Sequence, residues 1–439
     1  MEKRDVVVYS EDYKKLVDAT ALKDKYYEID ERVEEICKEA FKGCDKLEEI
    51  VMPKKLKKID SEAFQGCSSL TKLTLPSRVA SIGRWAFYGC SGLTELTLPD
   101  TLECIEAFAF CGCSGLTELT LPNRVRIIEV SAFEGCSGLT ELTLPNSVKI
   151  IGDGAFAYCS GLEKITVESG NSRYDSRDNC NSIIETATNT LIAGCKNSVI
   201  PNSVTSIGDS AFEGCTGLTE LTLPKSVKSI VDSAFYGCTG LTELTLSNSL
   251  KCIEAFAFSG CRGITKLTLP NSVTSIGDSA FGGCSGLTEL TLPNSVTSIG
   301  DCAFEGCTGL TELTLPKSVK SIGDYAFSGC RGITKLTLPN SVKSIGYSAF
   351  FACIGLTELT LPDSVTSIGD AAFSECSGLS KITSLAGIPP VFDRCMFVGE
   401  EFGEVNKANC ELIVPEESIT AYKQAKGWNE FSNIRGFSE

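Results

Sequence analysis

The feature that most constrains this chain is a repeat of 23 residues. Its most regular part, Gly-Leu-Thr-Glu-Leu-Thr-Leu-Pro, first occurs whole at residues 92–99, and a second marker, Ala-Phe-x-x-Cys, ends in a cysteine once in every period. These cysteines are Cys44, Cys67, Cys90, Cys113, Cys136, Cys159, Cys215, Cys238, Cys261, Cys284, Cys307, Cys330, Cys353 and Cys376. A fixed period of this length is typical of a solenoid, in which each coil contacts only its neighbours.

Within one coil, the alternation of apolar and polar residues indicates which segments are strands. Over residues 310–315, Glu312 and Thr314 should point outward and the leucines inward. Residues 318–322 are short and β-branched, which predicts a second strand on the opposite wall. Asp324 is placed to cap a single helical turn before the next Ala-Phe pair. The pattern therefore predicts an α/β repeat, with a parallel β-sheet on one face of the coils and short strands and single helical turns on the other.

The repeat also predicts the domain organisation. Residues 1–25 should form an N-terminal cap, either a loosely ordered tail or a short helix that starts at Ser10. The solenoid should span residues 26–385, with an irregular coil at 168–199 that carries a β-hairpin of strands 183–186 and 190–193. Residues 386–439 should form a C-terminal cap with a strand at 411–415 and a helix through Tyr422.

The 23 cysteines do not form a pattern of disulfide bonds. Fourteen occupy the same position of the repeat, so they should lie about 4.8 Å apart on neighbouring coils. Their Cβ vectors would run parallel, which is poor geometry for a bridge. We expect a ladder of buried free thiols and a reducing compartment. Cys111, beside the ladder residue Cys113, is expected at the surface.

Composition excludes several classes of function. A net charge of −16 argues against nucleic acid as a partner, and no stretch is long and apolar enough for a membrane span. Val6–Tyr9 is too short for the core of a signal peptide. Without histidine there can be no Ser–His or Cys–His nucleophile pair, and a lone Cys111-x-Cys113 does not supply four zinc ligands. The sequence predicts no catalytic residue, no metal site, no cofactor and no enzyme activity.

The outward positions of the strand remain as candidates for binding. One position alternates between Glu and Lys, and a threonine lies two residues later in each coil. Repeat proteins use extended faces of this kind to dock partners. The candidate binding residues are Glu95, Glu118, Glu141, Thr97, Thr120, Thr143, Glu220, Glu243, Lys266, Glu289, Glu312 and Lys335.

The pattern Ile-Gly-x-x-Ala-Phe-x-x-Cys-x-x-Leu-x-x-Leu-x-Leu-Pro, intact at residues 299–316, resembles the BspA-like leucine-rich repeat family. The resemblance covers about residues 26–430. It implies a right-handed leucine-rich-repeat solenoid without shared catalytic residues. It also implies a bacterial or protist surface protein that binds host matrix proteins or other cells, although the free thiols favour the cytoplasm.

Two functions from different classes remain open. The first is a non-enzymatic protein-binding or adhesion module that docks partners on the extended repeat face. The second is a passive structural spacer or surface-coat element without a specific ligand, which the uniformity of residues 203–382 favours. A threonine face that binds ice or carbohydrate is a third reading, and the interspersed Glu residues argue against it.

Overall fold

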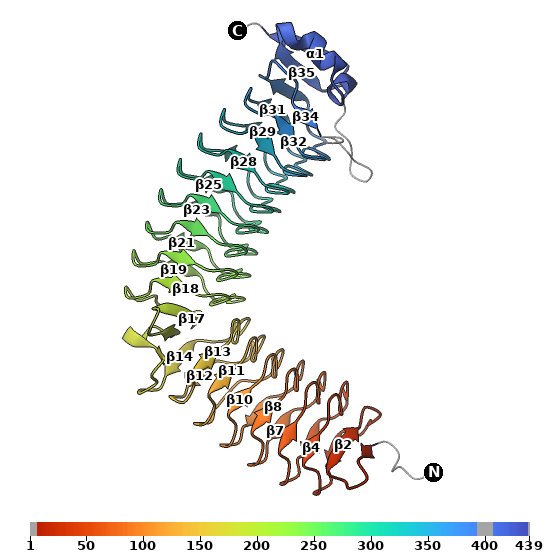
Figure 1. Cartoon of the computed structure of the whole chain (residues 1–439), viewed down its shortest axis with the longest axis vertical. Helices are drawn as coiled ribbons and strands as arrows, with labels where there is room; N and C mark the ends of the chain where they lie inside the picture. The colour runs from red at the N-terminus through yellow and green to blue at the C-terminus, as the bar shows by residue number, and fades with distance from the viewer. Residues whose placement is uncertain (1–6, 393–406, 438–439) are drawn as a thin grey trace. The chain divides into compact units, whose positions relative to one another are not determined.

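The computed structural model describes residues 7–392 and 407–437 (Figure 1). The chain divides between Leu218 and Thr219 into two compact units, and each is described by itself. Both units are stacks of similar coils, as the sequence predicts (Figure 1). Part of the predicted C-terminal cap, residues 393–406, lies outside the described residues, and the predicted domain boundaries stay predictions.

In the first unit, short strands stack into an eight-stranded sheet that is parallel from β2 onward. Its strands are β1 (Val8–Tyr9), β2 (Lys15–Asp18), β4 (Glu35–Ile36), β6 (Lys58–Ile59), β8 (Ser81–Ile82), β10 (Cys104–Ile105), β11 (Ile127–Ile128) and β13 (Ile150–Ile151). The Leu-Thr-Glu-Leu-Thr-Leu segments form two smaller parallel sheets. These contain β3 (Tyr26–Glu28), β5 (Glu49–Val51), β7 (Lys72–Thr74) and β9 (Glu95–Thr97), and β12 (Glu141–Leu144) with β14 (Lys164–Val167).

The N-terminal helix expected from Ser10 is wrong, because this segment is a β-hairpin. β1 pairs antiparallel with β2, and the Ser10 hydroxyl accepts a hydrogen bond from the Lys15 N–H at 3.0 Å. Tyr13 takes a left-handed φ of 57°, which a helix does not allow. Leu16 is fully buried and starts the core, so the hairpin caps the first coil.

The irregular coil contains the predicted hairpin. β16 (Ser182–Glu185) and β17 (Thr190–Gly194) pair antiparallel, and β15 (Tyr174–Asp175) adds to the far side of β16. The short 3-10 turn η2 (Arg177–Asn179) joins β15 to β16. β17 pairs parallel with β18 (Ser206–Ile207), so the hairpin continues the ladder of short strands into the next regular coil.

The second unit repeats this arrangement. Its short strands are β20 (Ser229–Ile230) and a seven-stranded parallel sheet of β22 (Cys252–Ile253), β24 (Ser275–Ile276), β26 (Ser298–Ile299), β28 (Ser321–Ile322), β30 (Ser344–Ile345), β32 (Ser367–Ile368) and β34 (Val391–Phe392). On the other side lie the pairs β19 (Glu220–Thr222) with β21 (Glu243–Thr245) and β23 (Lys266–Thr268) with β25 (Glu289–Thr291). A six-stranded sheet follows, of β27 (Leu313–Thr314), β29 (Lys335–Thr337), β31 (Glu358–Leu361), β33 (Lys381–Ser384), β35 (Glu411–Pro415) and β36 (Asn433–Phe437).

The predicted strand at residues 411–415 and the helix after it are confirmed, as β35, the 3-10 turn η3 (Glu416–Ser418) and α1 (Ile419–Gln424). Tyr422 is fully buried and bonds the Ser384 hydroxyl, and Trp428 in the 3-10 turn η4 (Trp428–Glu430) donates its indole N–H to the Pro390 carbonyl. The sequence did not predict β36, which pairs parallel with β35 as a further strand.

Two ladders of buried side chains fill each unit. Phenylalanine rings of successive coils stack with centroids 4.8 to 5.8 Å apart and nearly parallel planes. The cysteine thiol of most coils donates to the phenylalanine carbonyl of the coil before it, as from Cys284 to Phe258 at 3.2 Å. All described cysteines are free, which confirms the predicted thiol ladder. The prediction that Cys111 lies at the surface is wrong, because its exposed fraction is only 8%.

The segments expected as single helical turns are tighter turns, since the structure contains very little helix. In each, the residue before Ala-Phe has a left-handed φ, such as 54° at Cys302 and 55° at Tyr325. Asp324 does not cap its own turn. Its Oδ1 accepts the backbone N–H of Tyr347 in the next coil at 2.7 Å, and Asp301 does the same for the N–H of Asp324. These carboxylates therefore join neighbouring coils.

Candidate binding face

All twelve candidate residues lie exposed on the side of the Leu-Thr-Glu-Leu-Thr-Leu segments. The alternation that predicted this is confirmed, because Leu313 and Leu315 are buried while Glu312 and Thr314 are exposed. We call the outward Glu and Lys positions the charged row. It comprises Glu49, Lys72, Glu95, Glu118, Glu141 and Lys164 in the first unit, and Glu220, Glu243, Lys266, Glu289, Glu312, Lys335, Glu358 and Lys381 in the second.

Ion pairs neutralise part of the charged row. Lys72 contacts Glu95 at 2.7 Å and Lys164 contacts Glu141 at 3.3 Å. In the second unit, the pairs are Lys266 with Glu289 at 2.8 Å and Lys335 with Glu358 at 3.3 Å. Each of these lysines faces the glutamate of an adjoining coil. The hydrogen bond that Lys72 donates to Glu95 raises the pKa of Lys72. In the described residues, five glutamates of the charged row make no such pair, so the unneutralised negative charge lies on Glu49, Glu118, Glu220, Glu243 and Glu312.

The charges also coincide with breaks in the sheet. Glu118 lies between Glu95 and Glu141, and residues 117–121 form no strand, although the same octapeptide forms β9 and β12 in the adjoining coils. Glu312 follows Glu289 and lies outside β27. Like charges directly opposite one another destabilise strand pairing. Glu220 and Glu243 are opposed yet remain paired, so the effect weakens the ladder without always opening it. The break between β21 and β23 has no electrostatic explanation.

The threonines form two rows with different roles. Several of the threonines before the charged row donate a hydrogen bond from their hydroxyl to the preceding coil, as from Thr94 to the Thr71 carbonyl at 3.1 Å and from Thr288 to the Thr265 carbonyl at 3.0 Å. In the row that contains Thr97, Thr120 and Thr143, the Thr143 hydroxyl contacts that of Thr166 at 3.1 Å. This second row lies exposed beside the charged row and can donate to a partner.

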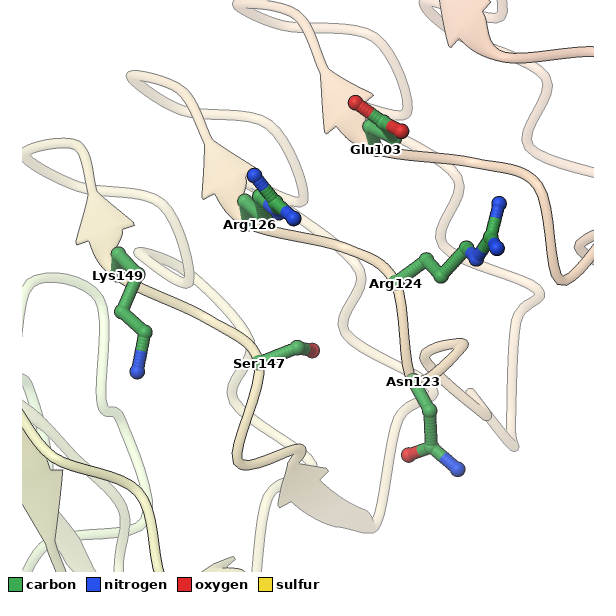
Figure 2. A pocket seen from close by; sticks show the side chains of 6 residues that line it. All are labelled: Glu103, Asn123, Arg124, Arg126, Ser147 and Lys149. Atoms are coloured by element: carbon green, nitrogen blue, oxygen red, sulfur yellow. The ribbon is translucent and has the colours of Figure 1, made fainter.

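Sequence reasoning missed a hollow of about 470 Å³ beside β10, β11 and β13 of the first unit. Figure 2 shows its six lining side chains, which come from three successive coils: Glu103, Asn123, Arg124, Arg126, Ser147 and Lys149. Three are basic and one is acidic, in a chain whose net charge is −16. The sequence carries part of this signal, because arginine occurs at the position of Arg126 in no other regular coil, whereas the position of Arg124 is also basic at Arg32, Lys55 and Arg78.

Two observations in the described residues bear on the expectation that the chain is not an enzyme. In the described residues, no group of three or more Cys, Asp or Glu side chains is arranged to hold a metal ion. Burial raises the pKa of the Cys44, Cys215 and Cys330 thiols to about 12, which makes them poor nucleophiles at neutral pH. None of the described helices has the length and apolar character needed to cross a bilayer.

The sequence profile described as "BspA type Leucine rich repeat region (6 copies)" matches residues 21–106, 81–192, 191–311 and 303–397. Proteins built from such repeats are generally non-enzymatic scaffolds that bind other proteins. A search of the curated proteins found no match.

Among the solved structures that are similar to this chain are two bacterial leucine-rich repeat proteins. A leucine-rich cell surface protein from Faecalibacterium prausnitzii is 28% identical, with a TM-score of 0.51, and the match covers 70% of this chain and 84% of that one. A leucine-rich repeat protein from Bacteroides ovatus is 25% identical over 91% of this chain and 97% of that one, with a TM-score of 0.49.

Proposed function

This chain belongs to the BspA-type leucine-rich repeat family, and we propose that it is a non-enzymatic adhesion module that docks partner proteins on its charged row. The observation that carries the proposal is the set of exposed, unneutralised carboxylates beside an exposed row of threonine hydroxyls. A cell surface location is part of the proposal, and the name of the Faecalibacterium protein supports it. The location can be tested by treating intact cells with protease and asking whether this chain is cleaved.

Within each unit, the docking surface should centre on the carboxylates that no lysine neutralises. Glu118, whose neighbours in the charged row are both glutamates, is the centre in the first unit, and Glu220 and Glu243, which lie opposite each other, are the centre in the second. A carboxylate already paired with lysine has little charge left to offer, whereas an unpaired one can accept charge-assisted hydrogen bonds from Lys or Arg. The partner surface should therefore be basic and rich in hydrogen-bond acceptors that match the threonines.

The Glu118→Lys variant is expected to lose partner binding at no cost in stability. The introduced lysine would lie between Glu95 and Glu141 in the charged row, so its two neighbours would be of opposite instead of like charge. We expect the free energy of unfolding to rise by about 0.5 to 1 kcal/mol, as for cross-strand pairs of opposite charge. Binding to immobilised matrix proteins, a collagen among them, is measured by surface plasmon resonance, and stability by thermal denaturation.

The matched control is Asp363→Lys, which makes the same charge change at an exposed position where other coils carry Lys225 and Lys317. It should leave binding unchanged. Unchanged binding in both variants would show that the charged row is not the docking surface. If the wild-type chain binds none of the matrix proteins, the passive spacer becomes the better explanation.

A further inference from the structure

The hollow beside β10, β11 and β13 is a cationic site on an acidic molecule. Arg124 and Arg126 are exposed, and in the described part of the chain neither guanidinium is in an ion pair. Lys149 is partly engaged, because its ammonium donates to the Ser172 hydroxyl at 2.8 Å. Figure 2 shows the two arginines on the same stretch of one coil, with Glu103 on the coil before and Ser147 and Lys149 on the coil after.

At both arginine positions, some other coils have a hydroxyl side chain that bonds to the preceding coil. At the position of Arg124, the next coil has Ser147, whose hydroxyl donates to the Val125 carbonyl at 2.8 Å. At the position of Arg126, Thr297 in the second unit donates to the Thr274 carbonyl at 3.3 Å. An arginine side chain does not reproduce these short hydroxyl bonds. This coil therefore presents two exposed guanidinium groups at positions where some coils have a hydroxyl that bonds to a neighbouring coil.

The lining indicates which ligand the hollow suits. A guanidinium group presents a planar fork that pairs with the two oxygens of a carboxylate or sulfate. The Asn123 amide and the Ser147 hydroxyl add neutral partners for hydroxyl groups, and Glu103 can accept from one. All six lining side chains are polar. A peptide anchors through apolar side chains, and no apolar side chain among the described residues lines this hollow to pack against them. The hydroxyl, carboxylate and sulfate groups of an acidic sugar match its polar lining.

We propose that this hollow binds an acidic oligosaccharide, with Arg124 and Arg126 holding a sulfate or carboxylate group and Asn123 and Ser147 contacting neighbouring hydroxyls. A volume of about 470 Å³ lies in the range of small-molecule sites, so one or two sugar units fill it. The interaction is exposed and electrostatic, so its affinity should fall as salt rises. The site is separate from the charged row and does not depend on the proposed function.

The chain itself supplies the test variant. Arg124→Ser combined with Arg126→Thr gives this coil the side chains that another coil has at the same repeat positions, Ser295 and Thr297. The double variant should therefore fold normally. The probe is a heparin-derived hexasaccharide, and binding to the full chain is measured by isothermal titration calorimetry at 50 and 300 mM NaCl. We expect the double variant to bind about tenfold or more weakly. Arg124→Lys with Arg126→Lys keeps the charge without the fork and should show an intermediate loss.

Two controls separate this site from general electrostatic attraction. Lys320→Thr with Lys343→Thr removes the same charge from exposed positions that correspond to Arg126, and it should leave binding unchanged. Inorganic sulfate should compete only at far higher concentration. The proposal is overturned if the hexasaccharide does not bind. It is also overturned if the Lys320→Thr, Lys343→Thr variant loses as much affinity as the Arg124→Ser, Arg126→Thr variant. Equal binding of a polyglutamate peptide would overturn the assignment to a sugar.

Discussion

Above about pH 9, the folded protein is expected to lose stability steeply. Burial raises the pKa of the Cys44, Cys111, Cys215 and Cys330 thiols to about 12, whereas an unfolded cysteine has a pKa of about 8.5. The folded state therefore keeps protons that the unfolded state releases. This contribution to stability is complete below the unfolded pKa and is lost as the pH rises toward 12.

The expected size follows from the number of thiols involved. Each costs about 1.4 kcal/mol per pH unit in this window. The loss from four thiols approaches the whole stability of a typical domain, about 5 to 15 kcal/mol, within two pH units. Urea denaturation followed by circular dichroism at pH 7, 8, 9 and 10, in the presence of a reducing agent, measures it.

The control for the alkaline effect is Cys330→Ser, which removes one titrating group from the ladder. This variant should be less stable at pH 7, because Cys330 is fully buried and donates to the Phe304 carbonyl. Its stability should then fall less steeply with pH than that of the wild-type chain. A urea midpoint that stays constant from pH 7 to pH 10 in the wild-type chain would contradict the explanation.

Phe258→Ala is expected to destabilise the second unit by about 3 to 5 kcal/mol, the usual cost of deleting a buried aromatic ring. Phe258 is fully buried, and its ring stacks between those of Phe235 at 5.1 Å and Phe281 at 5.5 Å. The cavity would interrupt the ring ladder on both sides. Because each coil is stabilised mainly by its neighbours, the adjoining coils should lose stability as well.

The control is Phe256→Ser in the same coil. Phe256 is 44% exposed and has a left-handed φ of 55°, and the adjoining coils have Ser233 and Ser279 at this position with φ of 54° and 52°. We expect a change within about 0.5 kcal/mol. Urea denaturation compares the two variants, and hydrogen exchange of the surrounding peptides locates the effect. Equal losses in both variants would contradict the assignment of the core.

Much of the fold was predictable because the same pattern of buried and exposed residues recurs in every coil. The inward leucines, the buried thiol ladder and the hairpin at residues 182–194 follow from local patterns that tertiary contacts reinforce. The prediction of an N-terminal helix was wrong because there the local pattern and the tertiary contacts favour different structures. The spacing of Tyr13 and Leu16 fits a helix, but pairing with the first coil stabilises a strand at Leu16 and a turn at Tyr13. The predicted exposure of Cys111 was wrong because this residue lies outside the repeated cysteine position, so no pattern predicted its burial.

For the candidate binding face too, one part was predictable from the sequence and another part was not. The sequence alone determined that the charged row and its threonines point outward, because alternation in a strand fixes which side chains face the core. It did not determine which carboxylates remain unpaired or which copies of Gly-Leu-Thr-Glu-Leu-Thr-Leu-Pro become strands. The copies around Glu95, Glu118 and Glu141 are identical, yet only the first and third, which adjoin Lys72 and Lys164, form β9 and β12. That difference arises only when coils stack, since the energy of a charge on an exposed strand depends on the charge opposite it.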